Sequence, residues 1–406
     1  MVLASKQFLA INGGTPTVEK PLPSWPSFGS DEIEAAAAVL ASGKVNYWTG
    51  EEGRQFEREY AAFVGTKFAI ALANGTVALE LALRSLGTGS GDEVIVPSRT
   101  FIATASCAVM CGAAPVVADV DLVSGNLTAE TIAPLISSRT QVIIAVHLAG
   151  WPCDMDPIIE LARKRGIHLI EDCAQAHGAT YKGRAVGSIG EVGAFSFCQD
   201  KILSTGGEGG LITTNDERAW NLAWSFKDHG KSFAAVYHQE HPIGFRWLHE
   251  SFGTNWRLTE MQSAIGRVLL RKLPESIGLR RRNAAILDQE FAKIPGLRVE
   301  RPGSDFCHSY YKYYVYVRPE LLRDGWNRDR IMTAVEAEGV PCSTGGCCEI
   351  YREKAFPRSL RPPSHLPNAA QLADTSLMFL VHPTLTTDDM YATASALEKV
   401  MSVASL

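Results

Sequence analysis

Lys201 and Asp172, in the middle of the chain, carry the side chains best suited to chemistry. Lys201 follows a short apolar stretch and precedes the glycine-rich run 206–210, where an amine could reach a buried electrophile. Asp172 ends the apolar run 169–172, which suits a carboxylate partner for a buried cation. A pyridoxal phosphate (PLP) site needs a lysine that forms a Schiff base and an aspartate that holds a protonated pyridine nitrogen. The sequence therefore predicts PLP chemistry centred on Lys201.

Three further residues could hold the phosphate of such a cofactor. Gly75 and Thr76 lie where a predicted strand passes into a predicted helix, so free backbone N–H groups and the positive helix end would face a ligand. Thr76 could also cap the helix, and taken alone the segment fits an ordinary capped helix better. Ser196, five residues before Lys201, is placed to bond a phosphate too. We expect the three residues to form a phosphate cradle.

Two residues could contact the cofactor ring. Gln175, one helical turn after Asp172, could bond the ring hydroxyl. Phe101 would enter a helix at the carboxyl edge of the sheet, where ligands bind in open α/β folds, and could stack on a planar ring. Core packing of Phe101 and helix capping by Asp172 are the alternative interpretations. The sequence leaves these alternatives open.

Composition excludes several classes of protein. At 406 residues the chain has room for roughly two to three domains. An apolar content of 46% and a charged content of 20% are those of an ordinary globular protein. A net charge of −5 gives no electrostatic case for nucleic acid. No apolar run reaches the ~20 residues of a membrane span, and the N-terminus lacks the pattern of a signal peptide.

The nine cysteines indicate a reducing compartment. Their number is odd, they are scattered, and no CxxC pair with zinc-ribbon spacing occurs. We expect no metal site, and we expect most of the cysteines to be small buried residues of a cytoplasmic protein.

The alternation of apolar runs and helical stretches from 68 to 214 predicts an α/β domain. Nearly continuous apolar strands interleaved with helices are typical of a parallel or mixed sheet that is covered on both faces. The predicted strands are 68–73, 93–96, 115–120, 142–146, 168–172, 192–197 and 210–213, and the predicted helices are 76–86, 104–110 and 155–165.

The chain changes character after Trp256. Residues 258–292 predict one or two long helices, interrupted near Pro274. A strand is expected at 310–317, and helices at 330–337 and 368–378. We therefore expect two domains: residues 1–265, an extended N-terminal arm of about thirty residues with a large PLP-binding domain, and residues 266–406, a smaller α+β domain.

Short segments in a fixed order resemble the DegT/DnrJ/EryC1/StrS family of PLP-dependent sugar aminotransferases. The resemblance runs from about Ile11 to His382. It implies the aspartate aminotransferase fold, whose large domain has a mainly parallel seven-stranded sheet. Its markers are the segments 53–57, 74–79, 91–97, 171–178, 195–197 before Lys201, 207–210 and 253–257.

The family likeness implies a role for each matching residue. Lys201 would be the Schiff-base lysine and proton shuttle, Asp172 the partner of the ring nitrogen, and Gln175 that of the ring hydroxyl. Phe101 would stack on the ring, and Gly75, Thr76 and Ser196 would hold the phosphate. Asn255 would reach the phosphate of a second subunit, so the resemblance implies a homodimer with shared active sites.

The likeness also implies the reaction. L-glutamate would convert PLP to pyridoxamine phosphate, and the ketone of a nucleotide-linked sugar would then receive the amine. The Cys- and Gly-rich segment 339–351 departs from the common family pattern near the substrate entrance. The segment resembles members of the family that act on UDP-linked 4-keto-6-deoxy-N-acetylhexosamines, which implies the C4 ketone of such a sugar as the acceptor, for surface polysaccharide or related amino-sugar biosynthesis.

Three alternatives remain beside this interpretation. A PLP-dependent sugar dehydratase of this family would carry histidine in place of Lys201, which argues against that activity. An aminotransferase of an aromatic-precursor pathway would share the scaffold, and a PLP-binding regulator without turnover would share the binding residues. Candidate sugar or nucleotide contacts, each of which could equally pack in the core or in a dimer, are Tyr47, Trp48, His229, His308 and Tyr310.

Overall fold

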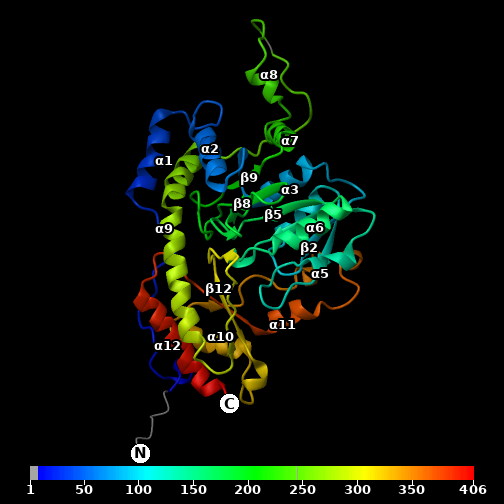
Figure 1. The fold of residues 1–406 in the computed structure, drawn as a ribbon. Helices are drawn as coiled ribbons and strands as arrows, with labels where there is room; N and C mark the ends of the chain where they lie inside the picture. Colours follow the sequence, from blue (N-terminus) through cyan, green and yellow to red (C-terminus); the bar gives the residue numbers. More distant parts are fainter. Residues whose placement is uncertain (1–7, 245) are drawn as a thin grey trace, which may run out of the picture.

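The structure, a computed structural model, describes residues 8–244 and 246–406 and is built around a seven-stranded sheet (Figure 1). Only β9 runs antiparallel to its neighbours β1 and β8, so the carboxyl ends of the other six strands meet at one edge. This arrangement confirms the predicted α/β fold with a mainly parallel sheet. In spatial order the strands are β1 (Phe68–Leu72), β9 (Gly210–Thr214), β8 (Val192–Ser196), β5 (His168–Asp172), β4 (Thr140–Val146), β2 (Glu93–Pro97) and β3 (Ala114–Ala118).

Both faces of this sheet are apolar because successive side chains of a strand point to opposite faces. In β1, Ile70 and Leu72 pack on one face, whereas Ala69 and Ala71 pack on the other. The first face is covered by α3 (Gly75–Ser85), α4 (Ala103–Met110) and α7 (Glu217–Lys227). The second is covered by α2 (Glu52–Val64), α6 (Met155–Arg165) and part of α9 (Glu260–Phe291).

A second core forms around a four-stranded antiparallel sheet in the C-terminal part of the chain. Its strands, in spatial order, are β10 (Leu297–Arg298), β12 (Tyr313–Val317), β14 (Ser376–Phe379) and β13 (Cys342–Ser343). The helices α10 (Arg328–Ala337) and α12 (Thr387–Ala404) and the end of α9 pack on it. The boundary that we expected between residues 265 and 266 falls inside α9, and we keep that division as a proposal.

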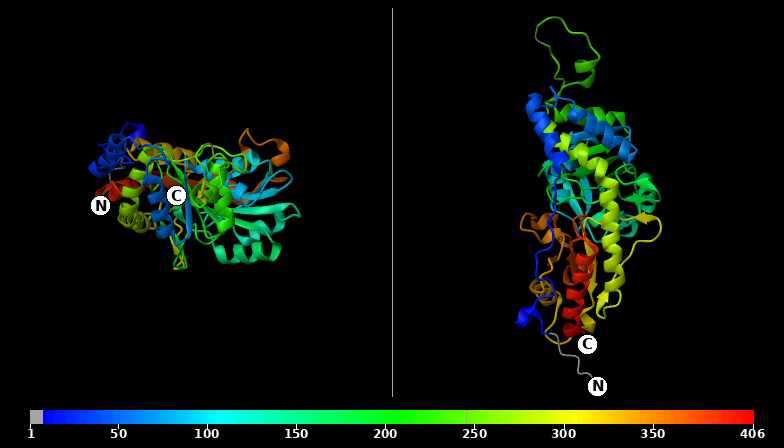
Figure 2. Two further views of the ribbon diagram at one scale, coloured as in Figure 1. Left: turned by 90° about the horizontal axis from the view of Figure 1, so that it is seen from above. Right: turned by 90° about the vertical axis from the view of Figure 1, so that its left-hand side faces the viewer.

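Helix α9 joins the two cores, and the predicted interruption near Pro274 is wrong. The helix is continuous over 32 residues, and a capping box between Thr259 and Gln262 begins it. A proline removes a backbone hydrogen bond from a helix. Burial on both sides of Pro274 favours the continuous helix: Leu270 before the proline and Ile277 after it both pack in the core of the large sheet. The helix runs along the molecule beside α1 and down to α12 (Figures 1 and 2).

Other boundaries also differ from the predictions. The helix expected at 368–378 ends at Thr375 as α11 (Pro367–Thr375), because residues 376–379 pair with β12 instead. The strand expected from residue 310 begins at Tyr313. Residues 8–29 contain one short 3-10 helix, η1 (Ala10–Asn12), before α1 (Ser30–Ser42).

The remaining elements are short. A three-stranded sheet consists of β11 (Phe306–Cys307), β6 (Thr180–Tyr181) and β7 (Arg184–Ala185). The segment between α7 and α9 projects beyond the large sheet (Figures 1 and 2). Within the described residues, no helix combines the length and apolar character needed to cross a membrane. The other helices are α5 (Ala129–Ile132), α8 (Phe233–Tyr237), η2 (Ala133–Leu135), η3 (Leu148–Gly150), η4 (Pro319–Leu321), η5 (Ile350–Arg352) and η6 (Arg358–Leu360).

Candidate active site

The carboxyl edge of the sheet brings the predicted phosphate residues together. Leu72 at the end of β1 and Ser196 at the end of β8 both pair with Gly210 of β9, so the turn after β1 lies beside Ser196. A Cβ atom on Gly75 would lie only 2.5 Å from Cβ and 2.9 Å from Oγ of Ser196. The cap of α3 is Asn74, not Thr76, because Asn74 Oδ1 accepts the N–H of Val77 at 3.0 Å. Glycine at 75 is therefore required by the close approach of these two turns.

Asp172 is a buried carboxylate held by neutral donors. Thr104 Oγ1 donates to Oδ2 at 2.9 Å, and the N–H of Ala174 donates to Oδ1 at 3.1 Å. The aspartate thus closes a turn and caps no helix. Burial raises the pKa of Asp172, although the two hydrogen bonds and the nearby charge of Lys201 act in the opposite direction. A cation placed against this carboxylate would lower its pKa and offset the cost of burial.

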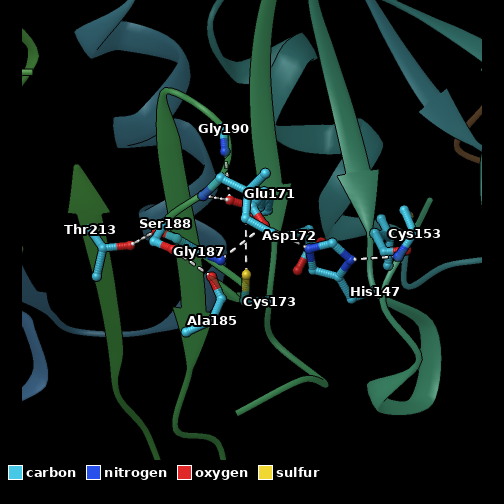
Figure 3. Close-up of polar contacts among 12 residues, drawn as sticks. His147, Cys153, Glu171, Asp172, Cys173, Ala185, Gly187, Ser188, Gly190 and Thr213 are labelled. Atoms are coloured by element: carbon cyan, nitrogen blue, oxygen red, sulfur yellow. Dashed lines mark hydrogen bonds and ion pairs between the residues drawn. The ribbon is translucent and has the colours of Figure 1, made fainter. Parts of the chain in front are cut away.

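A second buried carboxylate, Glu171, anchors the strand end that carries Asp172 (Figure 3). Its oxygens accept hydrogen bonds from the ring of His147 at 3.0 Å and from three backbone N–H groups. Burial alone would raise the pKa of Glu171, but these hydrogen bonds prevail and lower it. The three amides belong to the loop that follows β7, at Gly187, Ile189 and Gly190.

The group His147, Glu171 and Cys173 has ligand atoms within 4.8 Å of one another, a spacing that could suit a metal ion. Both ring nitrogens of His147 are already engaged: Nδ1 accepts the N–H of Cys153 at 3.0 Å, so Nε2 carries the proton that is donated to Glu171. A ring nitrogen that carries a proton is not a metal ligand. We interpret the group as a hydrogen-bond network that fixes the ends of β4 and β5.

Lys201 lies in the loop after β8, held from two sides. Its Nζ donates to the hydroxyl of Tyr311 at 3.3 Å and lies 4.6 Å from the centre of that ring. Asp200 lies 3.9 Å from the amine and accepts a hydrogen bond from Tyr311. The indole of Trp25 donates to the backbone oxygen of Lys201 at 2.9 Å. The amine thus faces a tyrosine that lies just before β12, whereas Trp25 of the N-terminal arm holds the backbone of Lys201.

The two expected ring contacts differ in their surroundings. Gln175 is fixed by its carbonyl oxygen, which accepts the N–H of Ala149 at 2.8 Å. Phe101 is 69% exposed just before α4, which excludes the core-packing alternative.

Asn255, the expected phosphate contact of a second subunit, pairs through its backbone with Asp228, in the projecting segment before α9. The roles inferred for Gln175, Phe101 and Asn255 stay predictions.

The five candidate sugar contacts fall into two groups. His308 and Tyr310 stack with their ring centres 3.9 Å apart, and they line a cavity of about 30 Å³ together with Ala149, whose N–H binds Gln175. Burial lowers the pKa of His308 to about 3, so its ring is neutral at neutral pH. These two residues lie on the side of the site that faces Gln175.

The other three candidates lie around α7, α8 and the projecting segment. Tyr47 is buried and bonds Glu57 at 3.1 Å, and Trp48 stacks on Tyr237. The backbone N–H of His229 donates to Thr254. For Tyr47 and Trp48, the packing interpretation accounts for the contacts observed within this chain.

Two site residues were missed by sequence reasoning. Thr104 supports Asp172, and Tyr311 contacts Lys201. A threonine inside a predicted helix does not by itself indicate a site residue. Thr104 supports Asp172 only because the fold places its helix beside β5. Tyr311 lies in an aromatic run, 310–316, whose members are alike in sequence but differ in what they contact.

Comparison with known proteins agrees with this geometry. Residues 26–398 match the profile of the DegT/DnrJ/EryC1/StrS aminotransferase family. The chain belongs to this family. It is accordingly a PLP-dependent aminotransferase, and the residues at the carboxyl edge of the sheet fit the group: a turn at Gly75 for the phosphate, a buried carboxylate with no cationic hydrogen-bond partner among residues 8–244 and 246–406, and an amine.

Three similar proteins illustrate the range of the family. The GDP-perosamine synthase of Caulobacter vibrioides is 36% identical over 87% of this chain and 92% of the relative. The UDP-N-acetyl-3-dehydro-alpha-D-glucosamine 3-aminotransferase of Acidithiobacillus ferrooxidans is 34% identical over 87% of this chain and 89% of the relative. An X-ray structure of the aminotransferase from Psychrobacter cryohalolentis superposes with a TM-score of 0.92, at 54% identity, and covers 94% of this chain and 99% of its own.

The close approach at Gly75 leads to a prediction. Gly75→Ala places a methyl group against Ser196, and such overpacking costs about 1–3 kcal/mol. We expect PLP to bind at least about tenfold more weakly, measured by fluorescence titration of the cofactor-free protein. The control is Gly89→Ala, where no described atom other than its chain neighbours lies within 4 Å of the added methyl. Equal PLP affinity of the two variants would show that the turn at Gly75 does not hold the phosphate.

Proposed function

We propose that this protein transfers the amino group of L-glutamate to the ketone of a nucleotide-linked keto-sugar. The observation that carries the proposal is the convergence of an amine, Lys201, and a buried carboxylate, Asp172, at one edge of the sheet. The relatives support the acceptor class, because the names of two similar proteins refer to a GDP-linked and a UDP-linked sugar.

Each residue of the site has a task in this reaction. PLP, when bound, supplies the electron sink for breaking a bond at the substrate carbon. The Asp172 carboxylate keeps the ring nitrogen protonated, and the Nζ of Lys201 takes and returns the proton. Gly75, Thr76 and Ser196 bind the phosphate, Gln175 bonds the ring hydroxyl, and Phe101 covers a ring face.

For the acceptor itself we propose the C4 ketone of a UDP-linked 4-keto-6-deoxy-N-acetylhexosamine, in surface polysaccharide or related amino-sugar biosynthesis. The Cys- and Gly-rich segment 339–351 supports a distinct substrate entrance. It lies next to the turn before Phe101: Cys347 O accepts the N–H of Thr100 at 3.1 Å, and Ser98 O accepts the N–H of Ile350 at 3.0 Å. His308 and Tyr310, on the side of the site that faces Gln175, are the sugar contacts that we retain.

The proposed function predicts which variant loses turnover. With L-glutamate and a panel of UDP-, dTDP- and GDP-linked keto-sugars, we expect mass spectrometry to show an amino-sugar, formed best from the UDP-linked compound. Lys201→Ala should lose this product and the visible absorbance of the bound cofactor, because the amine that holds PLP and moves the proton is gone. Lys354→Ala, at an exposed lysine, is the control.

Three outcomes would contradict the proposal. An aromatic keto acceptor that is converted in preference would assign the chain to an aromatic-precursor pathway. A deoxygenated sugar would indicate a dehydratase. PLP binding without turnover of any acceptor in the panel would favour a regulator.

We also propose a homodimer in which Asn255 reaches the phosphate site of the partner subunit. The projecting segment that carries Asn255 supports this, because Ile243 and Phe252 are fully exposed on it, and exposed apolar side chains suit contact with a second copy. A cytoplasmic location is proposed as well. Its support is that all nine cysteines lie in the described residues and are free thiols, as in a reducing compartment.

Shared sites can be tested by mixing two inactive variants. If Asn255 acts in the partner's site, a mixed dimer of Lys201→Ala and Asn255→Ala contains one intact site. Randomly remixed subunits should then regain up to about a quarter of wild-type turnover, because half of the dimers are mixed and one of their two sites is complete. No recovery from two variants that are each inactive and still associate would show that Asn255 serves its own subunit.

A further inference from the structure

Arg280, in the middle of α9, is a buried cation that forms no ion pair in the described part of the chain. Its side chain is 1% exposed, yet Nε and Nη2 have no hydrogen-bond partner among the described residues. Only Nη1 is engaged, at 3.3 Å and 3.4 Å from the backbone oxygens of Tyr310 and Tyr311. A guanidinium has five N–H donors in a planar fork that matches a carboxylate. Leaving these donors buried and unpaired is costly.

The surroundings of Arg280 connect it to the loop of Lys201. The guanidinium lies 5.1 Å from the ring centre of Trp25, and the indole N–H of Trp25 donates to the backbone oxygen of Lys201 at 2.9 Å. Tyr311, whose backbone oxygen faces Arg280, contacts Nζ of Lys201 through its hydroxyl. Trp25 and Tyr311 therefore each contact both Arg280 and Lys201.

Positive charge exceeds negative charge around this point. Lys312 lies 3.7 Å from Asp200, which also lies 3.9 Å from Lys201, so Asp200 serves as the shared counter-charge of two lysines. Burial lowers the pKa of Arg280 to about 9, although Tyr311 and Asp200 act in the opposite direction. Burial and the charges of Arg280 and Lys201 lower the pKa of Lys312 as well, and they outweigh Asp200. An additional anion would therefore stabilise the cluster of Arg280, Lys312 and Lys201, which share the single carboxylate of Asp200 among the described residues.

We propose that Arg280, assisted by Lys312, binds a carboxylate group of the amino-acid donor and of the 2-oxo acid that it becomes. The inference rests on the proposed function, since it assigns the donor side of the same site. A donor whose amine would take the place of the Lys201 amine on the cofactor would bring its carboxylate close to Lys201, and the unpaired fork of Arg280 is suited to receive it. Entry requires the half-buried Trp25 ring to move aside, because it covers the guanidinium.

Binding of glutarate, a dicarboxylate with neither amine nor ketone, tests the proposal without turnover. Isothermal titration calorimetry of the PLP-loaded full chain should detect glutarate binding, and Arg280→Met should weaken it at least about tenfold, the loss of one charged hydrogen bond. The matched control is Arg271→Met, at an exposed arginine of the same helix, which should bind glutarate like the wild type. Wild type and Arg280→Met with equal affinity, or wild type without any binding, would overturn the proposal.

Two further measurements keep the outcome clear. If Arg280→Met does not fold, as judged by circular dichroism and cofactor absorbance, Lys312→Met decides: weaker glutarate binding supports the site, and unchanged binding overturns it. In single half-reactions, Arg280→Met should raise the glutamate concentration needed for conversion of PLP, whereas reaction of the pyridoxamine phosphate form with the keto-sugar stays unchanged. If no keto-sugar reacts but glutarate binding depends on Arg280, the proposed acceptor fails and the donor site stands.

Discussion

The site depends on one electrostatic constraint: the carboxylate of Asp172 is buried at the end of a central strand, and its hydrogen-bond donors in the described part of the chain are neutral. Burial raises the pKa of this carboxylate, and a cation placed against it would stabilise the anion. In the proposed function a protonated pyridine ring would be that cation, and the carboxylate would in turn keep the ring nitrogen protonated. Other residues at this edge of the sheet hold the Asp172 carboxylate in place. The network of Glu171 and His147 fixes the strand end, and Thr104 orients the carboxylate from α4.

Helix α9 links this edge to the C-terminal part of the chain. Its first half packs in the core of the large sheet and its last turns pack on the small sheet, so residues of both parts reach the loop of Lys201. Tyr311 lies just before β12 of the small sheet, and Trp25 lies in the N-terminal arm. Arg280 lies on the helix itself, between Ile277, which packs in the core of the large sheet, and Ala284, which packs in that of the small one.

The sequence predicts those features that depend on local pattern. Apolar runs ending in Asp172 and before Lys201 identified β5 and β8, and the turn at Gly75 identified the start of α3. Features that depend on tertiary contacts could not be predicted. Pro274 lies inside a helix because burial on both sides outweighs the lost hydrogen bond, and residues 376–379 form a strand because β12 offers them a partner. Thr104, Tyr311 and Arg280 are distant from Asp172 and Lys201 in the sequence, and only the fold shows what each contacts.

The central claim is that Asp172 holds the ring nitrogen of PLP in its protonated form. The most direct measurement is the 15N chemical shift of that nitrogen in the loaded protein at neutral pH, in the wild type and in Asp172→Asn. The account predicts a protonated nitrogen in the wild type and its loss in the variant, because the uncharged amide no longer stabilises a cation. A neutral ring nitrogen in the wild type, or an unchanged shift in Asp172→Asn, would contradict it.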